Sequence, residues 1–114
     1  MRRYCFALDL KNDHSVIAGY EEEHRHVWPE IIKSIRDAGI TVMDIYRTGN
    51  RLFMIMEVDD SFSFERKNAM DASNPIVQKW ETFMSSFQQE IPWAKKGEKW
   101  VMMEQIFNLG EPGK

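Results

Sequence analysis

The stretch Thr41–Val58, which reads TVMDIYRTGNRLFMIMEV, decides the fold. Its two halves flank Thr48-Gly49-Asn50, a combination typical of a tight turn, so we predict a β-hairpin. The second half is apolar at every position from Leu52 to Met56, whereas a strand with one wet face alternates between apolar and polar residues. We therefore expect this strand to lie at the centre of a sheet with both of its faces covered.

Apolar periodicity predicts the elements on either side of the hairpin. Tyr4–Leu10 alternates as a first strand does. A helix follows after Asn12 or Asp13, and Pro29 is expected to kink or restart it before Gly39 ends it. The remaining predicted elements are a short helix over Ser61–Met70, an amphipathic helix from Pro75 to Phe87, and a last strand over Trp100–Leu109.

The order β-α-β-β-α-β predicts an α+β fold of the ferredoxin-like type, in which helices cover one side of an antiparallel sheet. The chain has no further elements to cover the second face of the sheet. We therefore predict a homodimer of the dimeric α/β-barrel type, in which the sheets of two copies pack together. Residues 1–109 are expected to form a single domain, and residues 110–114 a flexible tail.

The composition excludes several classes of function. The chain has 114 residues and a net charge of −3, and no group of Lys and Arg is larger than a pair, so nucleic acid is not an expected partner. Asp9 and Lys11 interrupt the apolar residues near Met1, so we expect neither a signal peptide nor a membrane-spanning segment. The single cysteine is typical of a reducing compartment, so we expect a cytoplasmic protein. The three histidines lack zinc-type spacing, so no metal site is predicted.

Three ring-bearing residues recur at every fourth position in the first predicted helix. Tyr20, His24 and Trp28 would share one side of that helix. The spacing alone fits a packed aromatic surface with a hydrogen-bonded histidine. It also fits a site in which a histidine transfers protons near neutral pH and aromatic rings contact the ligand.

A resemblance bears on this choice. The stretch Tyr20–Glu30, YEEEHRHVWPE, resembles the Tyr-x-x-x-His-x-x-x-Trp-Pro-Glu signature of the L-rhamnose mutarotase family. The similarity continues at Ile45-Tyr46, from Leu52-Phe53 to Glu57-Val58, at Gln78-Lys79-Trp80 and at Ile106-Phe107. It implies a dimeric ferredoxin-like enzyme that interconverts the α and β anomers of a monosaccharide without a metal or organic cofactor.

The resemblance also implies roles for individual residues. His24 would be the catalytic proton donor, Tyr20 would bind the sugar, and Trp80 would contact it. Trp28, in line with Tyr20 and His24, is predicted to be a further substrate-binding ring.

Two positions depart from the rhamnose enzymes of this family. Met43 stands where they have a tyrosine, and Glu81 where they have the second of two adjacent tryptophans. These departures imply the same reaction on a different 6-deoxyhexose, with L-fucose and L-rhamnose as the two candidates. If His24 does not carry the chemistry, Glu57, Glu104 and His26 are the next acid–base candidates. A cofactor-free monooxygenase of the same architecture and a non-enzymatic metabolite-binding dimer are the alternative functions.

Overall fold

The computed structural model describes residues 2–113, which form five strands and four helices. In chain order these are β1 (Arg2–Leu10), α1 (His14–His24), α2 (Pro29–Asp37), β2 (Ile40–Thr48), β3 (Arg51–Val58), α3 (Phe64–Ala72), α4 (Pro75–Ser85), β4 (Gln88–Gln89) and β5 (Val101–Met102).

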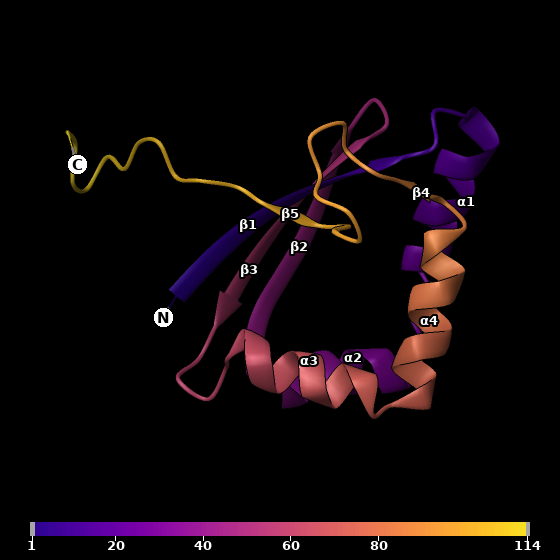
Figure 1. Cartoon of the computed structure of the whole chain (residues 1–114), viewed down its shortest axis with the longest axis horizontal. Helices are drawn as coiled ribbons and strands as arrows, with labels where there is room; N and C mark the ends of the chain where they lie inside the picture. The colour runs from indigo at the N-terminus through magenta and orange to yellow at the C-terminus, as the bar shows by residue number, and fades with distance from the viewer. Residues whose placement is uncertain (1, 114) are drawn as a thin grey trace.

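The strands form one antiparallel sheet in the order β2-β3-β1-β4, and the short β5 also pairs with β1. β3 lies between β2 and β1, which confirms the central position predicted from its unbroken apolar sequence. Figure 1 shows the helices gathered to one side of the sheet, with α1 and α4 at the right and α2 and α3 below. The predicted ferredoxin-like α+β class is confirmed.

The two faces of the sheet differ in cover. Along β3, Leu52, Met54, Met56 and Val58 are buried on the helical side, whereas the alternate residues between them are half-buried. We call the other side the outer face; half-buried Cys5, Ala7, Phe53 and Ile55 form its centre. An ion pair lies at each end of the outer face. Arg3 and Glu57 are 3.1 Å apart at one end, and Arg51 and Asp9 are 2.7 Å apart at the other.

Polar caps set the starts of the two longest helices. The Asp13 carboxylate accepts hydrogen bonds from the backbone N–H groups of Ser15 and Val16 and begins α1. Asn74 accepts equivalent bonds at the start of α4, where Pro75 is the first residue. Pro29 restarts the chain as α2 rather than kinking one long helix, because its ring fits the first helical turn and Trp28 before it is extended.

The predicted last strand over Trp100–Leu109 is wrong for most of its length. Only Val101–Met102 pairs with β1, and the last ladder contact is the Met103 N–H donating to the Cys5 carbonyl at 2.7 Å. Beyond it the chain leaves the sheet and runs away from the rest of the molecule (Figure 1). Residues 104–109, called the C-terminal arm here, therefore make no strand with their own sheet.

Within residues 2–113, no helix is both long and apolar enough to cross a membrane, and the longest, α1 and α4, have 11 residues each.

Gly39, between α2 and β2, lies in close contact with the loop that follows β3, and this contact can be tested. Its φ is +94°, and an added Cβ would lie 2.5 Å from the Asp59 carboxylate and 2.6 Å from the Ser61 hydroxyl. Gly49 in the β2–β3 turn also has positive φ but an empty neighbourhood. Gly49→Ala should lower the free energy of unfolding by about 1 kcal/mol. Gly39→Ala should lower it by at least about 1 kcal/mol more, because backbone strain and overpacking combine. Urea unfolding of both variants measures the difference, and equal losses would contradict the close packing at Gly39.

Candidate active site

Helix α1 places the first two predicted site residues one turn apart near its end. The rings of Tyr20 and His24 lie 4.3 Å apart between centroids and are tilted by 33°. Tyr20 is buried, with 3% of its surface exposed, and His24, the last residue of α1, is half-buried. The spacing therefore brings a buried phenol and a partly accessible imidazole together, as predicted.

A backbone contact orients the imidazole. The Nδ1 atom of His24 lies 2.8 Å from the carbonyl oxygen of Tyr20. A carbonyl oxygen can only accept a hydrogen bond, so Nδ1 carries hydrogen in this arrangement. The other ring nitrogen, Nε2, is left to exchange a proton with a ligand.

Burial also controls the charge of Tyr20. Loss of water contact raises the pKa of the Tyr20 phenol to about 12, while a hydrogen bond from the Gln88 side chain acts in the opposite direction. The phenol therefore keeps its proton at neutral pH and can act as a hydrogen-bond donor. Gln88 was not predicted, because a glutamine after an amphipathic helix carries no recognisable signal in the sequence.

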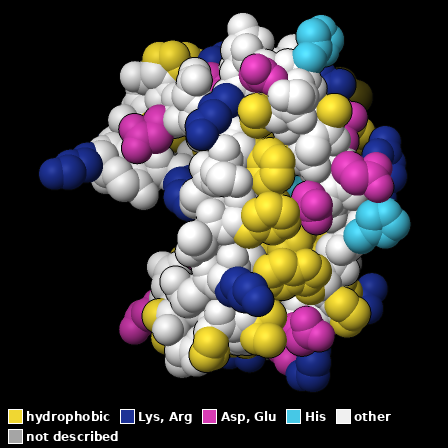
Figure 2. All heavy atoms as spheres, turned by 90° about the vertical axis from the view of Figure 1, so that its right-hand side faces the viewer, with side chains coloured by type: hydrophobic (Ala, Val, Ile, Leu, Met, Phe, Trp, Pro, Cys, Tyr) yellow, Lys and Arg dark blue, Asp and Glu magenta, His cyan; other side chains and the backbone are white. Residues whose placement is uncertain are grey.

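A chain of rings continues from His24 into α4. The His24 and Trp80 centroids are 5.8 Å apart, and those of Trp80 and Trp28 are 5.0 Å apart. Trp28 also stacks parallel to Phe83 at 6.3 Å. It lies beyond the end of α1, so the helix does not present Tyr20, His24 and Trp28 in one line as predicted. Figure 2 shows hydrophobic side chains running down the helical face of the molecule, beside acidic and basic ones.

A cavity of about 1130 Å³ lies between the sheet and the helices, next to these rings. Tyr20, His24 and Trp80 line it, whereas Trp28 does not. The sheet contributes an apolar floor that includes Phe6, Met43, Ile45, Met54 and Met56. Polar and charged side chains, among them Glu81, Gln88 and Lys99, also line it. A mainly apolar cavity with a few polar groups is the usual form of a small-molecule site.

Both positions at which the sequence departs from the rhamnose enzymes lie in this cavity. Met43 is part of its floor, and Glu81 follows Trp80 along α4. Differences at these positions therefore face whatever ligand the cavity holds.

The three other acid–base candidates lie elsewhere. Glu57 pairs with Arg3 on the outer face, and His26 is exposed and 3.2 Å from the Glu22 carboxylate. Glu104 is exposed on the C-terminal arm. None of these three lines the cavity, so His24 is the candidate that the geometry supports.

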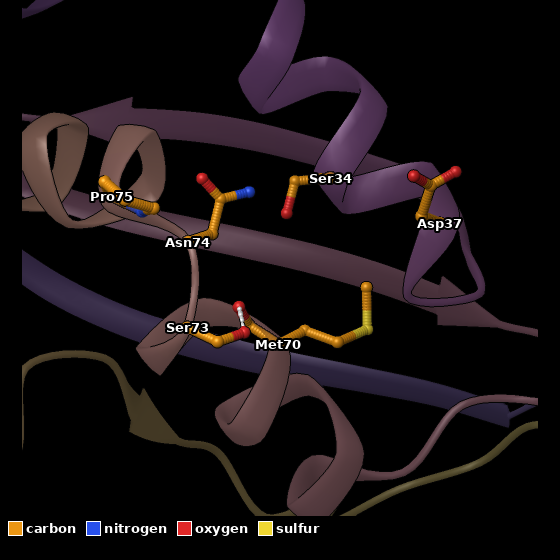
Figure 3. Close-up of a pocket in the computed structure, with 6 residues that line it drawn as sticks. All are labelled: Ser34, Asp37, Met70, Ser73, Asn74 and Pro75. Carbon is orange, nitrogen blue, oxygen red and sulfur yellow. Dashed lines mark hydrogen bonds between the residues drawn. The ribbon is translucent and has the colours of Figure 1, made fainter.

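A second pocket of about 310 Å³ lies where α2 meets the connection between α3 and α4 (Figure 3). Its polar groups are largely engaged: the Ser73 hydroxyl donates to the Met70 carbonyl at 3.0 Å, and Asp37 pairs with Lys33. Figure 3 shows the Asp37 carboxylate pointing away from the other lining residues. The larger cavity is therefore the candidate site. Over residues 2–113, no group of three or more His, Cys, Asp or Glu is arranged to hold a metal ion.

Comparison with known proteins agrees with this geometry. Residues 3–109 match the model of the L-rhamnose mutarotase family. The chain belongs to this family. The predicted family and the predicted enzyme class are thus confirmed: mutarotases are isomerases that act on carbohydrates.

Two relatives of this mutarotase are named for different sugars. It is 43% identical to the L-fucose mutarotase of Xanthomonas campestris pv. campestris over 97% of this chain and 90% of the relative. It is 32% identical to the L-rhamnose mutarotase of Phocaeicola vulgatus over 81% and 85%.

Two solved structures share its fold. The crystal structure of an L-rhamnose mutarotase from Formosa agariphila superposes with a TM-score of 0.70 at 26% identity, covering 96% of this chain and 99% of that one. The tetracenomycin F2 cyclase of Streptomyces glaucescens, at 16% identity, matches with a TM-score of 0.60 over 98% and 100%, which shows a common fold alone.

The raised pKa of Tyr20 can be measured directly. The protein has three tyrosines, and Tyr20→Phe removes one of them. The difference in absorbance at 295 nm between parent and variant should titrate near pH 12 rather than near the ordinary value of about 10, because burial disfavours the phenolate. Tyr46→Phe is the matched control, since Tyr46 is 59% exposed. A Tyr20 difference that titrates near the ordinary tyrosine pKa of about 10 would contradict the buried phenol.

Proposed function

We propose that this mutarotase interconverts the α and β anomers of L-fucose, with L-rhamnose as the second candidate substrate, by proton exchange at His24 and without a cofactor. The observation that carries the proposal is the free Nε2 of His24 in a cavity that also receives Tyr20 and Trp80. The 43% identity to an L-fucose mutarotase, against 32% to an L-rhamnose mutarotase, favours the first sugar.

The reaction needs only proton transfers. In its imidazolium form, His24 donates the Nε2 proton to the ring oxygen as the bond between that oxygen and C1 breaks. The anomeric hydroxyl loses its proton to solvent water, and C1 becomes an aldehyde carbon. Rotation about the C1–C2 bond presents the other face of the aldehyde, and the same steps in reverse close the ring as the other anomer. Protons and electrons balance, and the enzyme returns to its first state.

The neighbouring side chains would bind and orient the sugar. Tyr20 keeps its phenolic proton at neutral pH, so its O–H can donate a hydrogen bond to a sugar hydroxyl. Trp80 provides an aromatic surface and an indole N–H. The floor with Met43, Met54 and Met56 offers an apolar surface for the methyl group that distinguishes a 6-deoxyhexose. Trp28 would act through Trp80, whose ring it contacts.

His24→Ala should lower the rate of anomer exchange by about 10²–10⁴-fold, because it removes the proton carrier. His26→Ala is the matched control, as His26 is exposed and two residues away. Tyr20→Phe should lose less than His24→Ala, because the ring remains. Saturation-difference NMR with L-fucose and L-rhamnose measures exchange in all four proteins.

Two results would contradict this assignment. A folded His24→Ala variant with parental exchange would place the chemistry on another residue. Sugar binding without any exchange in the parent would identify a binding module instead.

We also propose that the protein is a homodimer. Its C-terminal arm exposes large apolar side chains: Ile106 is 90%, Phe107 63% and Leu109 82% exposed. The same chain leaves the apolar centre of its outer face without a covering helix (Figure 1). In a dimer with a two-fold axis, the second copy would cover both the C-terminal arm and the outer face of the first, and the first would cover those of the second.

Ile106→Asp should shift the protein from dimer to monomer in analytical ultracentrifugation, because a charge in the buried contact is costly. Ile76→Asp makes the same substitution on α4, where Ile76 is 40% exposed, and should leave the dimer intact. An Ile106→Asp protein that sediments like the parent dimer would show that the arm does not hold two copies together. A monomeric parent would contradict the dimer itself.

A further inference from the structure

Trp100 lies in the sugar cavity but belongs to none of the elements that carry the mutarotase signature. It directly precedes β5, and the register of β5 on β1 pairs Met102 with Phe6. Side chains alternate along a strand, so Trp100 points to the same side as Met102 and Phe6. That side faces the helices, and Trp100 lines the cavity together with His24 and Trp80.

The position of Trp100 is well defined by its surroundings. The ring packs against both hydrophobic clusters of the core, the one around Met54 and Met56 and the one around Tyr20 and Leu52. The preceding residue, Lys99, donates a hydrogen bond to the Ser85 hydroxyl at the end of α4. The segment before β5 is thus attached both to the sheet and to the helix that carries Trp80.

Trp100 is nonetheless not a fully buried core residue. It is half-buried, and its indole N–H makes no hydrogen bond to a residue in the part of the chain that the structure describes. The N–H of Trp80 likewise has no such partner. Two indoles from different elements therefore line one cavity with their donors free, which is the arrangement that a polyhydroxylated ligand can satisfy.

We propose that Trp100 is a sugar-contacting residue that favours L-fucose over L-rhamnose. This rests on the proposed mutarotase function. The axial 4-hydroxyl of L-fucose leaves the C–H groups at C3, C4 and C5 together on one face of the ring, next to the methyl group. An indole packs well on such a continuous apolar surface. L-Rhamnose has an equatorial 4-hydroxyl and an axial 2-hydroxyl, so it offers a smaller apolar face to the same ring.

The test is the kinetics of Trp100→Ala and Trp100→Phe with both sugars. Trp100→Ala should raise KM for L-fucose by about tenfold, with kcat nearly unchanged, because it removes a contact equal in substrate and transition state. KM for L-rhamnose should rise less. Trp100→Phe should recover part of the loss, since it restores an aromatic face.

Trp93→Ala is the matched control. Trp93 lies in the same segment, is 63% exposed, sits 5.1 Å from the Arg51 guanidinium and does not line the cavity. It should leave both KM values unchanged. Thermal unfolding of all variants separates loss of binding from loss of fold, and Trp100→Phe carries the test if Trp100→Ala does not fold.

The possible results separate this inference from the proposed function. Parental KM values in folded Trp100 variants, or an equal effect on both sugars, would overturn the role of Trp100 while the mutarotase stands. If the parent exchanges neither sugar, saturation-transfer NMR of sugar binding decides. Selective loss of L-fucose binding in Trp100→Ala would support the contact, and no binding to the parent would overturn both proposals.

Discussion

The apolar character of both faces of β3 is the constraint on which the rest of the structure depends. This strand lies inside the sheet and carries apolar residues on both faces. On one face, Met54 and Met56 meet the helices and the cavity. On the other, Phe53 and Ile55 form part of a half-buried surface closed at its ends by ion pairs. One strand thus supplies part of the floor of the site and part of the surface proposed to meet a second copy. The site and the proposed dimer both follow from the need to cover the two apolar faces of this strand.

The break between α1 and α2 positions the proposed catalytic side chain, His24, at the cavity. Because α1 ends at His24 and Pro29 begins a new helix, the imidazole sits at a helix end that opens on the cavity. The Tyr20 carbonyl fixes its orientation, and the buried Tyr20 ring supports it from one side. Backbone geometry therefore presents one ring nitrogen to the ligand without a further side chain.

The parts of this structure that could be predicted from the sequence are those with local causes. The Gly49 turn, the cap at Asp13 and the unbroken apolar run in β3 each act over a few residues, and all three led to correct elements. The last strand was overestimated because Ile106 and Phe107 look like core residues, although they contact nothing that buries them within their own chain.

The candidate site could be predicted only in part, for the same reason. Helical spacing and the family signature predict Tyr20 and His24, whereas Trp80 is predicted only by the resemblance that continues at Gln78-Lys79-Trp80. Gln88, Lys99 and Trp100 reach the cavity through the pairing of β4 and β5 with β1, which no local pattern encodes. Trp28 lies beyond a helix break, because the residue before Pro29 is extended, so its four-residue spacing from His24 does not place it on the same helix face.

The most direct test of the central claim is anomer exchange by the purified wild-type protein, measured by saturation-difference NMR in buffer with excess EDTA and no added cofactor. We predict that exchange of L-fucose is faster than in buffer alone, and faster than that of L-rhamnose at equal concentration. Exchange at the buffer rate for both sugars would contradict a mutarotase site at His24.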